Sequence, residues 1–307
     1  MIIKVIITLA LFLILLPHNT IGQQQSPIHV PESLNKQRLT ALSLTTATLY
    51  SSSMLGLYYL WYHDYPKSRF HFYDDNQDWL KMDKAGHVTT AYQLGYYGYQ
   101  SLRWTGLDEN QAVWIGGSFG LLYLSSVEMF DGFSKEWGFS IGDFAANTIG
   151  TSLFISQQLL WKEQRISPKF SFSRSKYAQF RPSLLGDNLI EQIVKDYNGQ
   201  TYWISVNIHS FLKTESKFPD WLNLAFGYGA NGMLGPADNP TIVDGIEIPN
   251  FKRYSQYYFS PDIDLTRIPT NSKFLKVTFG LLNFIKIPMP AIEYNKQEGF
   301  KFHIMYF

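Results

Sequence analysis

Three pairs of polar residues in the first half of the chain are spaced so that each pair shares one face of a helix. These pairs are Asp83 with His87, Glu128 with Asp131, and Asp143 with Asn147, and Lys84 directly follows Asp83. An imidazole beside carboxylates could perform general acid–base chemistry, and a lysine could hold a phosphate or a carboxylate. The spacing matches no known zinc signature such as HExxH, so it indicates no particular metal, and we expect no cofactor.

Helical periodicity and capping patterns predict the elements that carry these pairs. An uncharged stretch at residues 41–62 predicts a first helix, followed by helices at residues 83–104, 108–130 and 140–161. The capping residues are Asp83, Asp108 with Gln111, and Ser140 with Asp143. Four such helices joined by short loops predict an antiparallel bundle, and the sequence leaves open whether this bundle lies in lipid.

In an antiparallel bundle, the three pairs would meet at one end. One hypothesis is a membrane-surface enzyme acting on a lipid or cell-wall headgroup. His87 would be its general base or nucleophile, Lys84 would bind the headgroup, and Glu128 or Asp143 would orient the imidazole. The other hypothesis is structural, because acids are favoured at helix starts and buried ion pairs cluster just as active sites do.

The same residues carry a resemblance to a known family. The segments DKAGH at 83–87, EMFD at 128–131 and SIGDFAANTIG at 140–150 resemble the YfiM-type predicted periplasmic lipoproteins. Their layout is also similar to that of VanZ-like membrane proteins. The resemblance covers residues 83–158. It implies a shared polar core of unknown function, formed by Asp83, Lys84, His87, Glu128, Asp131, Asp143 and Asn147. The 307 residues contain no cysteine, so the lipid anchor of such lipoproteins does not carry over.

The start of the chain and its composition indicate export. Lys4, an apolar run at 5–16 and small residues before Gln23 are typical of a secretory signal peptide at 1–22. The net charge of +1 gives no support for nucleic-acid binding. Aromatic residues make up 17% of the chain, which suits surfaces that are apolar at one end and wet at the other.

The chain changes from helical to alternating patterns near Pro168. Residues 202–208, 222–228, 257–265 and 300–306 alternate as strands do, with Pro261 marking an edge or a bulge, and residues 272–285 resemble a short amphipathic helix. An aromatic C-terminal residue is a feature of outer-membrane barrels, but the strands are too few for a complete barrel. We therefore predict an α+β protein, with a four-helix bundle at 35–165 followed by a curved antiparallel sheet region with one short helix at 166–307.

Together these features favour an exported, membrane-associated protein of the bacterial cell envelope with a binding or structural role. Its expected partners are membrane lipid or an envelope protein, and its expected location is the outer membrane or the periplasm. The headgroup-processing enzyme is the alternative. The sequence contains no nucleophile elbow, P-loop or dinucleotide fingerprint that would define a more specific chemistry.

Overall fold

The computed structural model describes residues 30–63, 65–212, 217–243 and 245–307. The predicted signal peptide at 1–22 lies outside these residues. The chain divides into a helical unit, formed by residues up to Asp75 with 90–164 and 272–278, and a sheet unit, formed by 76–89, 165–271 and 279–307. Each unit is described separately below.

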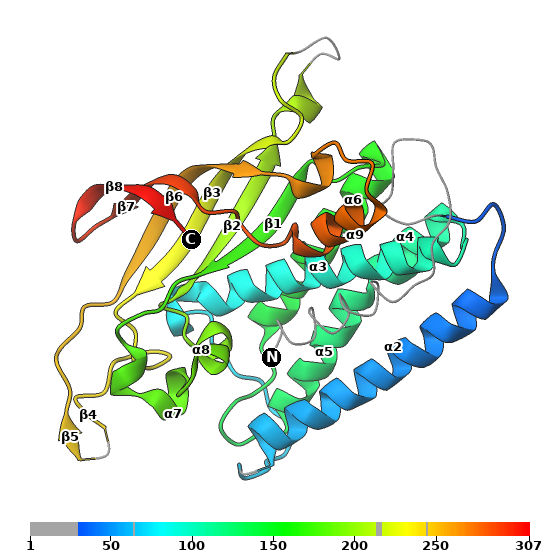
Figure 1. Ribbon diagram of the computed structural model, residues 1–307. Coiled ribbons are helices and arrows are strands. Elements are labelled where there is room, and N and C mark those ends of the chain that lie inside the picture. Colours follow the sequence, from blue (N-terminus) through cyan, green and yellow to red (C-terminus); the bar gives the residue numbers. More distant parts are fainter. Residues whose placement is uncertain (1–29, 64, 213–216, 244) are drawn as a thin grey trace. The chain divides into compact units, whose positions relative to one another are not determined.

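The helical unit is built from antiparallel helices (Figure 1). Its elements are α2 (Lys36–Leu57), a π-helical turn (Tyr58–Tyr62), the part of α3 (Met82–Trp104) that starts at Thr90, α4 (Glu109–Gly117), α5 (Phe119–Gly132) and α6 (Ile141–Trp161). The stretch Glu109–Gly132 is the one part of the described chain with the length and apolar composition to cross a membrane, which many core helices also have.

Close helix crossings fix the register of α3 against α4 and α5. A Cβ on Gly98 would lie 2.5 Å from the Gly116 carbonyl oxygen, and one on Gly120 would lie 2.2 Å from that of Ala91. Only glycine at these positions allows the backbones to approach so closely. Since the position on α3 decreases as the position on α4 and α5 increases, these helices are antiparallel.

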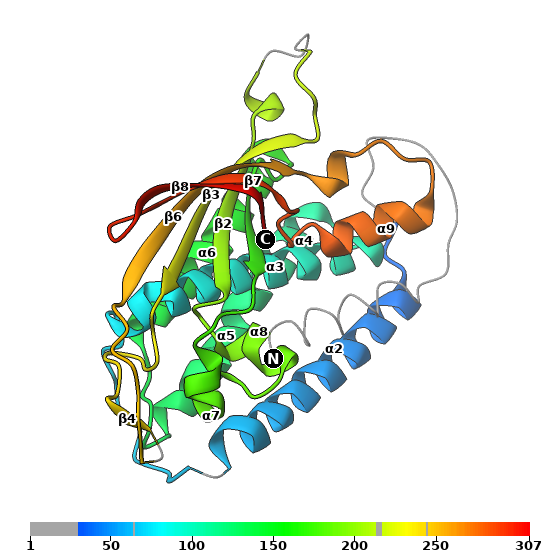
Figure 2. The same cartoon turned by 60° about the vertical axis from the view of Figure 1, so that its left-hand side comes forward.

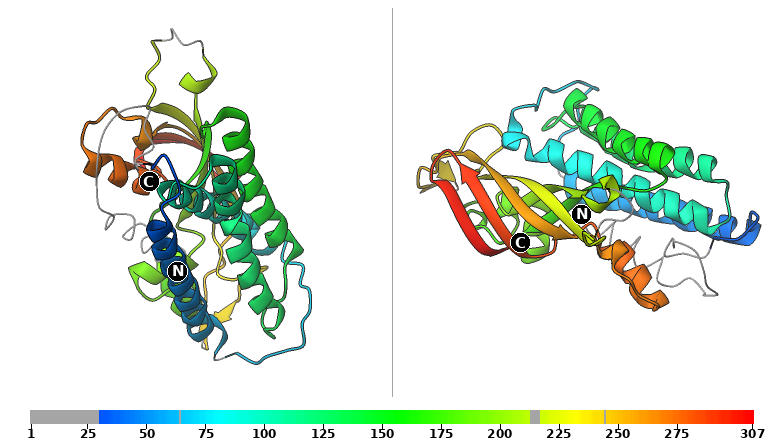
Figure 3. Two further views of the ribbon diagram at one scale, coloured as in Figure 1. Left: turned by 90° about the vertical axis from the view of Figure 1, so that its right-hand side faces the viewer. Right: turned by 90° about the horizontal axis from the view of Figure 1, so that it is seen from above.

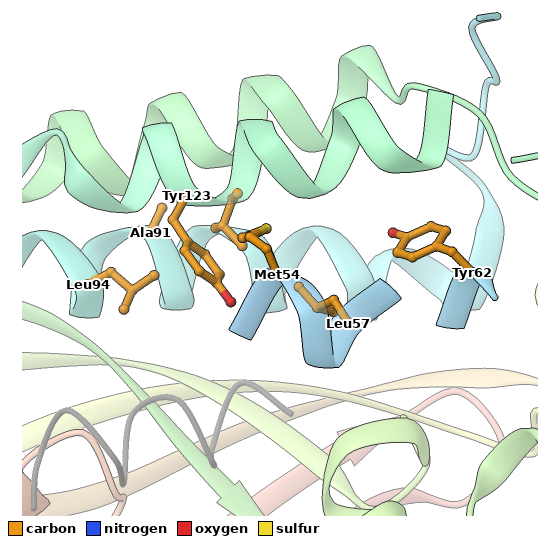
Figure 4. Packing of buried hydrophobic residues seen from close by; sticks show 7 residues of the cluster. Met54, Leu57, Tyr62, Ala91, Leu94 and Tyr123 are labelled. Carbon is orange, nitrogen blue, oxygen red and sulfur yellow. The ribbon is translucent and has the colours of Figure 1, made fainter. Parts of the chain in front are cut away.

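A compact apolar cluster lies beside this crossing (Figure 4). Met54 and Leu57 of α2 pack there with Ala91 and Leu94 of α3 and with Tyr123 of α5. The burial of these side chains holds α2 to the rest of the bundle. A second cluster around Phe154 joins α6 to α3 and α4.

The predicted helix boundaries are confirmed with three differences. The first helix begins at Lys36, five residues before the predicted start, and changes to a π-helical turn after Leu57. Asp108 and Ser140 cap their helices as expected, since their side-chain oxygens accept backbone N–H groups two or three residues later. Helix α3 begins at Met82, so Asp83 lies inside its first turn rather than at the N-cap. The single helix predicted at 108–130 is divided at Ser118 into α4 and α5.

The sheet unit contains a six-stranded antiparallel sheet in the order β1-β2-β3-β6-β7-β8 (Figure 2). Its strands are β1 (Ile166–Phe172), β2 (Gln200–Asn207), β3 (Leu222–Asn231), β6 (Tyr254–Ile263), β7 (Met289–Asn295) and β8 (Gly299–Tyr306). The other elements are α7 (Pro182–Leu185), α8 (Leu189–Lys195), the hairpin of β4 (Ile242–Val243) and β5 (Ile246–Glu247), and α9 (Lys273–Leu282), whose first turns count with the helical unit.

The α+β prediction is confirmed, and the sheet contains more than the sequence indicated. The four predicted strands correspond to β2, β3, β6 and β8, and the amphipathic helix corresponds to α9. Strands β1 and β7 and helices α7 and α8 were not predicted. Pro261 lies in β6, which is central, but β7 pairs only with Gln256–Phe259. Pro261 is therefore in a stretch where one neighbouring strand has already ended, a position that tolerates a missing N–H.

The sheet is strongly curved, and its last strand returns toward its second one (Figure 3). The Tyr306 ring of β8 packs 4.4 Å from that of Tyr258 and 6.0 Å from that of Trp203, between ring centroids. The Tyr306 and Thr201 hydroxyls lie 3.1 Å apart. A register shift between Met289 and Ala291 in the β7–β8 pairing accompanies this change of direction, as expected of a β-bulge.

Candidate functional site

The first group of predicted site residues lies on the opening turns of α3, within the sheet unit. The His87 Nε2 atom lies 3.7 Å from Asp83 Oδ1, and Lys84 Nζ lies 3.5 Å from Asp83 Oδ2. The side chains of Lys84 and His87 are each 15% exposed, against 25% for Asp83. An acid in the first turn is also favoured by the positive end of the helix dipole. The four-residue spacing thus brings an imidazole, an ammonium and a carboxylate together, as predicted.

Two tyrosines that the sequence analysis missed surround this group. The Tyr197 hydroxyl donates a hydrogen bond of 2.6 Å to Asp83 Oδ1. Burial raises the pKa of the Tyr202 phenol, and the negative charge of Asp83 raises it further. A Cβ on Gly86 would lie 2.9 Å from the Tyr202 hydroxyl oxygen, so glycine allows α3 to approach strand β2 here. These contacts join residues far apart in sequence, which helical spacing could not reveal.

The backbone that leads into α3 is in an uncommon conformation. Trp79, Leu80 and Lys81 all have positive φ angles, of 50°, 50° and 66°. Each such residue costs about 1–2 kcal/mol relative to ordinary backbone conformations. Two hydrogen bonds offset this cost, from the Trp79 amide to the Pro236 carbonyl and from the Tyr228 hydroxyl to the Leu80 carbonyl. The start of α3 is therefore held against the sheet by contacts on both sides of the turn.

The second group of predicted residues lies in the helical unit, where α5 ends and α6 begins. The Ser140 amide donates to Glu128 Oε2 at 3.1 Å, and the Asp143 amide donates to Ser140 Oγ at 3.0 Å. The Ser140 hydroxyl donates to Asp75 Oδ1 at 2.5 Å. Glu128 is 2% exposed and Asp143 is 3% exposed. A buried glutamate thus accepts an N–H at the start of α6, a structural role that also leaves its carboxylate inside the bundle.

The other two predicted residues of the helical unit are Asp131 on α5 and Asn147 on α6. The Tyr62 hydroxyl donates to Asp131 Oδ1 at 2.7 Å, and burial raises the pKa of Tyr62, with the Asp131 carboxylate acting in the same direction. Tyr62 therefore remains a protonated donor. Asn147 is fully buried on α6, one turn after Asp143. Asp75 and Tyr62 are partners that the motif analysis did not identify.

The seven predicted residues thus form two local groups, one in each unit. Within each group the predicted neighbours are close, and the meeting of the two groups at one end of the bundle stays a prediction. Asp83, His87 and Asp143 have the donor types that a metal ion could use. The group on α3 has the parts of a general acid–base site, whereas the hydrogen bonds of Glu128 and Ser140 are those of a helix junction.

A third buried charge cluster lies inside the curved sheet and was not predicted. Lys169 of β1 forms an ion pair of 2.8 Å with Asp262 of β6, and both side chains are fully buried. Lys169 Nζ also donates to the Ile263 carbonyl at 2.7 Å and to Asn283 Oδ1 at 3.3 Å. Ser205 of β2 donates to Asp262 Oδ2 at 2.7 Å. Lys169 is therefore fully satisfied, as a buried cation must be.

A second lysine approaches the same carboxylate less closely. Lys286 Nζ is also fully buried, 3.9 Å from Asp262 Oδ1 and 5.0 Å from the centre of the Trp203 ring. Burial lowers the pKa of Lys286 to about 8; the charge of Asp262 opposes that effect and the charge of Lys169 adds to it. When both lysines are protonated, the cluster of two cations and one anion carries an excess positive charge, which the Trp203 ring partly stabilises.

Comparison with known protein families gives a match over part of the chain. Residues 71–157 match the model of a family described as "Predicted periplasmic lipoprotein (DUF2279)". The matched segment contains all seven predicted polar residues and covers under a third of the chain. It confirms the predicted likeness to periplasmic lipoproteins over those residues, and no match reports a VanZ-like protein. No curated protein and no solved structure matches the chain.

Proposed function

We propose that the protein is an exported, membrane-associated protein of the bacterial cell envelope with a binding or structural role. The observation that carries this proposal is the distribution of side chains on α5 and α6. Glu128, Asp143 and Asn147 are buried, whereas outward positions on the same helices are apolar and exposed. These exposed residues are Leu122, Met129, Ile149 and Leu160. Helices with polar interiors and apolar exteriors are typical of contact with lipid.

The proposal includes a shared polar core formed by Asp83, Lys84, His87, Glu128, Asp131, Asp143 and Asn147. The local contacts of each group support it. His87 lies 3.7 Å from Asp83, and Glu128 accepts the Ser140 amide one turn before Asp143. In this view His87 and Asp143 each stabilise the group to which they belong, and their main effect is on stability.

A fractionation experiment tests the location. Inner and outer membranes would be separated on a density gradient and each washed with alkaline carbonate. We expect retention in the outer membrane. Release into the periplasmic fraction by osmotic shock alone would contradict membrane association. Retention in the inner membrane would instead favour the alternative function, an enzyme acting on a lipid or cell-wall headgroup with His87 as the base.

Substitution of the core residues tests the role. We expect His87→Ala and Asp143→Ala to lower the free energy of unfolding by about 2–4 kcal/mol each, since both side chains are largely buried within polar groups. The matched control is His209→Ala. His209 pairs with Asp220 at 2.7 Å, but both side chains are partly exposed. That change should cost less than about 1 kcal/mol. If the melting temperature of the His87 and Asp143 variants is unchanged, the structural role is wrong.

A further inference from the structure

The two faces of the six-stranded sheet have the reverse of the usual polarity. On the face inside the curve, most side chains are polar and buried, and they surround the rings of Trp203, Tyr258 and Tyr306. They include Lys169, Ser171, Thr201, Ser205, Asn207, Asn223, Gln256, Ser260, Asp262, Glu293 and Asn295. On the opposite face, the side chains are apolar and exposed, and they include Ile204, Phe226, Phe259, Ile292, Phe300, Phe302 and Ile304. An antiparallel sheet with one face in water normally buries its apolar face.

The polar side chains of the inner face form a hydrogen-bonded network. Glu293 accepts hydrogen bonds from Gln256 at 2.7 Å and from Asn295 at 2.8 Å, and its other oxygen lies 2.8 Å from His303 Nε2. The Lys169–Asp262 pair lies on the same face. Buried polar groups with such partners are stable inside the curve, so the inverted polarity is a consistent feature of the fold rather than a local fault.

The exposed apolar face is ordered by residue type along the strands. The register places Tyr257 opposite Tyr294, and Tyr294 opposite Phe300, in one row across β6, β7 and β8. The next row away from the β7–β8 turn contains Phe259, Ile292 and Phe302. Beyond the tyrosine row, the turn itself carries Lys296 and Glu298. Moving away from this turn, the charged residues come first, then the tyrosines, and then phenylalanine and isoleucine. Side chains at a membrane interface follow the same order with increasing depth in the bilayer.

We propose that this face, defined as Phe226 of β3 and the outward side chains of β6, β7 and β8, rests on the acyl chains of a lipid bilayer, a proposal that rests on the membrane association proposed above. The outward positions of these strands carry no charged residue in the part of the chain that is described. Protein interfaces of similar aromatic content usually include arginine and a polar rim, so lipid fits this face better than a second protein.

The dimensions agree with insertion into one leaflet. On β6 the apolar positions run from Tyr257 to Ile263, which at about 3.3 Å per residue is about 20 Å. The hydrocarbon core of a bilayer is about 30 Å thick. The face is therefore too short to cross the bilayer and long enough to enter one leaflet, with the tyrosine row at the headgroups.

The absence of native cysteine allows a direct test on the full chain. A single cysteine would be introduced as Ile292→Cys on the proposed face or as Ile246→Cys on the β4–β5 hairpin, where the exposed fractions are 46% and 67%. Each would carry an environment-sensitive fluorophore, and the protein would be mixed with phosphatidylethanolamine–phosphatidylglycerol vesicles containing brominated acyl chains. We expect strong quenching of the label at residue 292 and little quenching at residue 246.

Vesicle flotation gives the second measurement. We expect Phe259→Glu combined with Ile292→Glu to lower vesicle binding at least tenfold, whereas Ile246→Glu leaves it unchanged. If the protein floats with vesicles but the label at residue 292 is not quenched, the proposal for this face is wrong and membrane association stands. If the protein does not float, both proposals fail. A dimer in sedimentation that both glutamates dissociate, without lipid, would assign the face to a second copy and overturn the lipid proposal.

Discussion

The two units bury charge in different ways. In the helical unit, Glu128 and Asp143 lie near helix ends, where they or their neighbours accept backbone N–H groups. In the sheet unit, Lys169 and Asp262 lie within strands and pair with each other across the curve of the sheet. The helical acids depend on local backbone geometry, whereas the sheet cluster depends on the whole fold. Loss of one partner should therefore cost more in the sheet.

The largest effect is expected from Lys169→Met. It would leave Asp262 buried with a serine and a lysine 3.9 Å away, and we expect a loss of about 3–5 kcal/mol in the free energy of unfolding. Chemical denaturation of the purified protein measures it. The control is Lys195→Met, which removes a partly exposed pair with Glu191 and should cost less than about 1 kcal/mol. Equal costs for the two variants would remove the distinction between the sheet cluster and an ordinary surface pair.

The second effect depends on pH. The pKa of Lys286 is about 8 in the folded protein, against an ordinary value of 10.5. Between these values the unfolded chain binds more protons than the folded chain, so the contribution of Lys286 to stability rises with pH. A difference of about 2.5 pKa units corresponds to at most about 3 kcal/mol. Lys286→Met should flatten this rise, and at pH 7 it should be neutral or stabilising because Asp262 keeps Lys169.

Unfolding free energies at pH 8 and at pH 10 check this prediction. Lys301→Met is the control, since Lys301 pairs with Glu298 at the exposed β7–β8 turn. Tyrosines that ionise in this pH range affect all three proteins alike, so the difference between variants isolates Lys286. If the wild type and Lys286→Met show the same pH dependence, Lys286 is charged in both states and the cation–π contact with Trp203 is stronger than its burial.

The polar groups of the helices and the charge cluster of the sheet also show what the sequence could predict. Asp83 with His87 was found because a four-residue spacing places two side chains on one helix face in any helix. Ser140 was found because its capping role depends only on the next three residues. The contact between Lys169 and Asp262 requires the register of β1, β2, β3 and β6, and no local pattern encodes it.

The missed strands have a similar explanation. Strand β1 alternates between an apolar face and a buried polar face that includes Lys169 and Ser171. A sequence analysis that assigns apolar residues to the core interprets lysine at such a position as exposed. The sequence therefore did not predict β1, because its buried face is polar. Identifying this inverted polarity requires both the strand order and the burial of each side chain.

The smallest predicted effects compare one tyrosine from each unit. Tyr62 donates to Asp131 in the helical unit, and Tyr197 donates to Asp83 in the sheet unit. Each tyrosine-to-phenylalanine change removes one hydrogen bond to a carboxylate, which is worth about 1–3 kcal/mol. Tyr62 is 8% exposed, and the Asp83 side chain is 25% exposed, so water can replace Tyr197 more easily. We expect Tyr62→Phe to lower the free energy of unfolding by about 2 kcal/mol and Tyr197→Phe to lower it by about 1 kcal/mol. Thermal unfolding measures both effects. Tyr59→Phe is the control, because Tyr59 is exposed. The reverse order would show that Asp83 depends on Tyr197 more than its exposure indicates, and that the start of α3 is held mainly by the sheet.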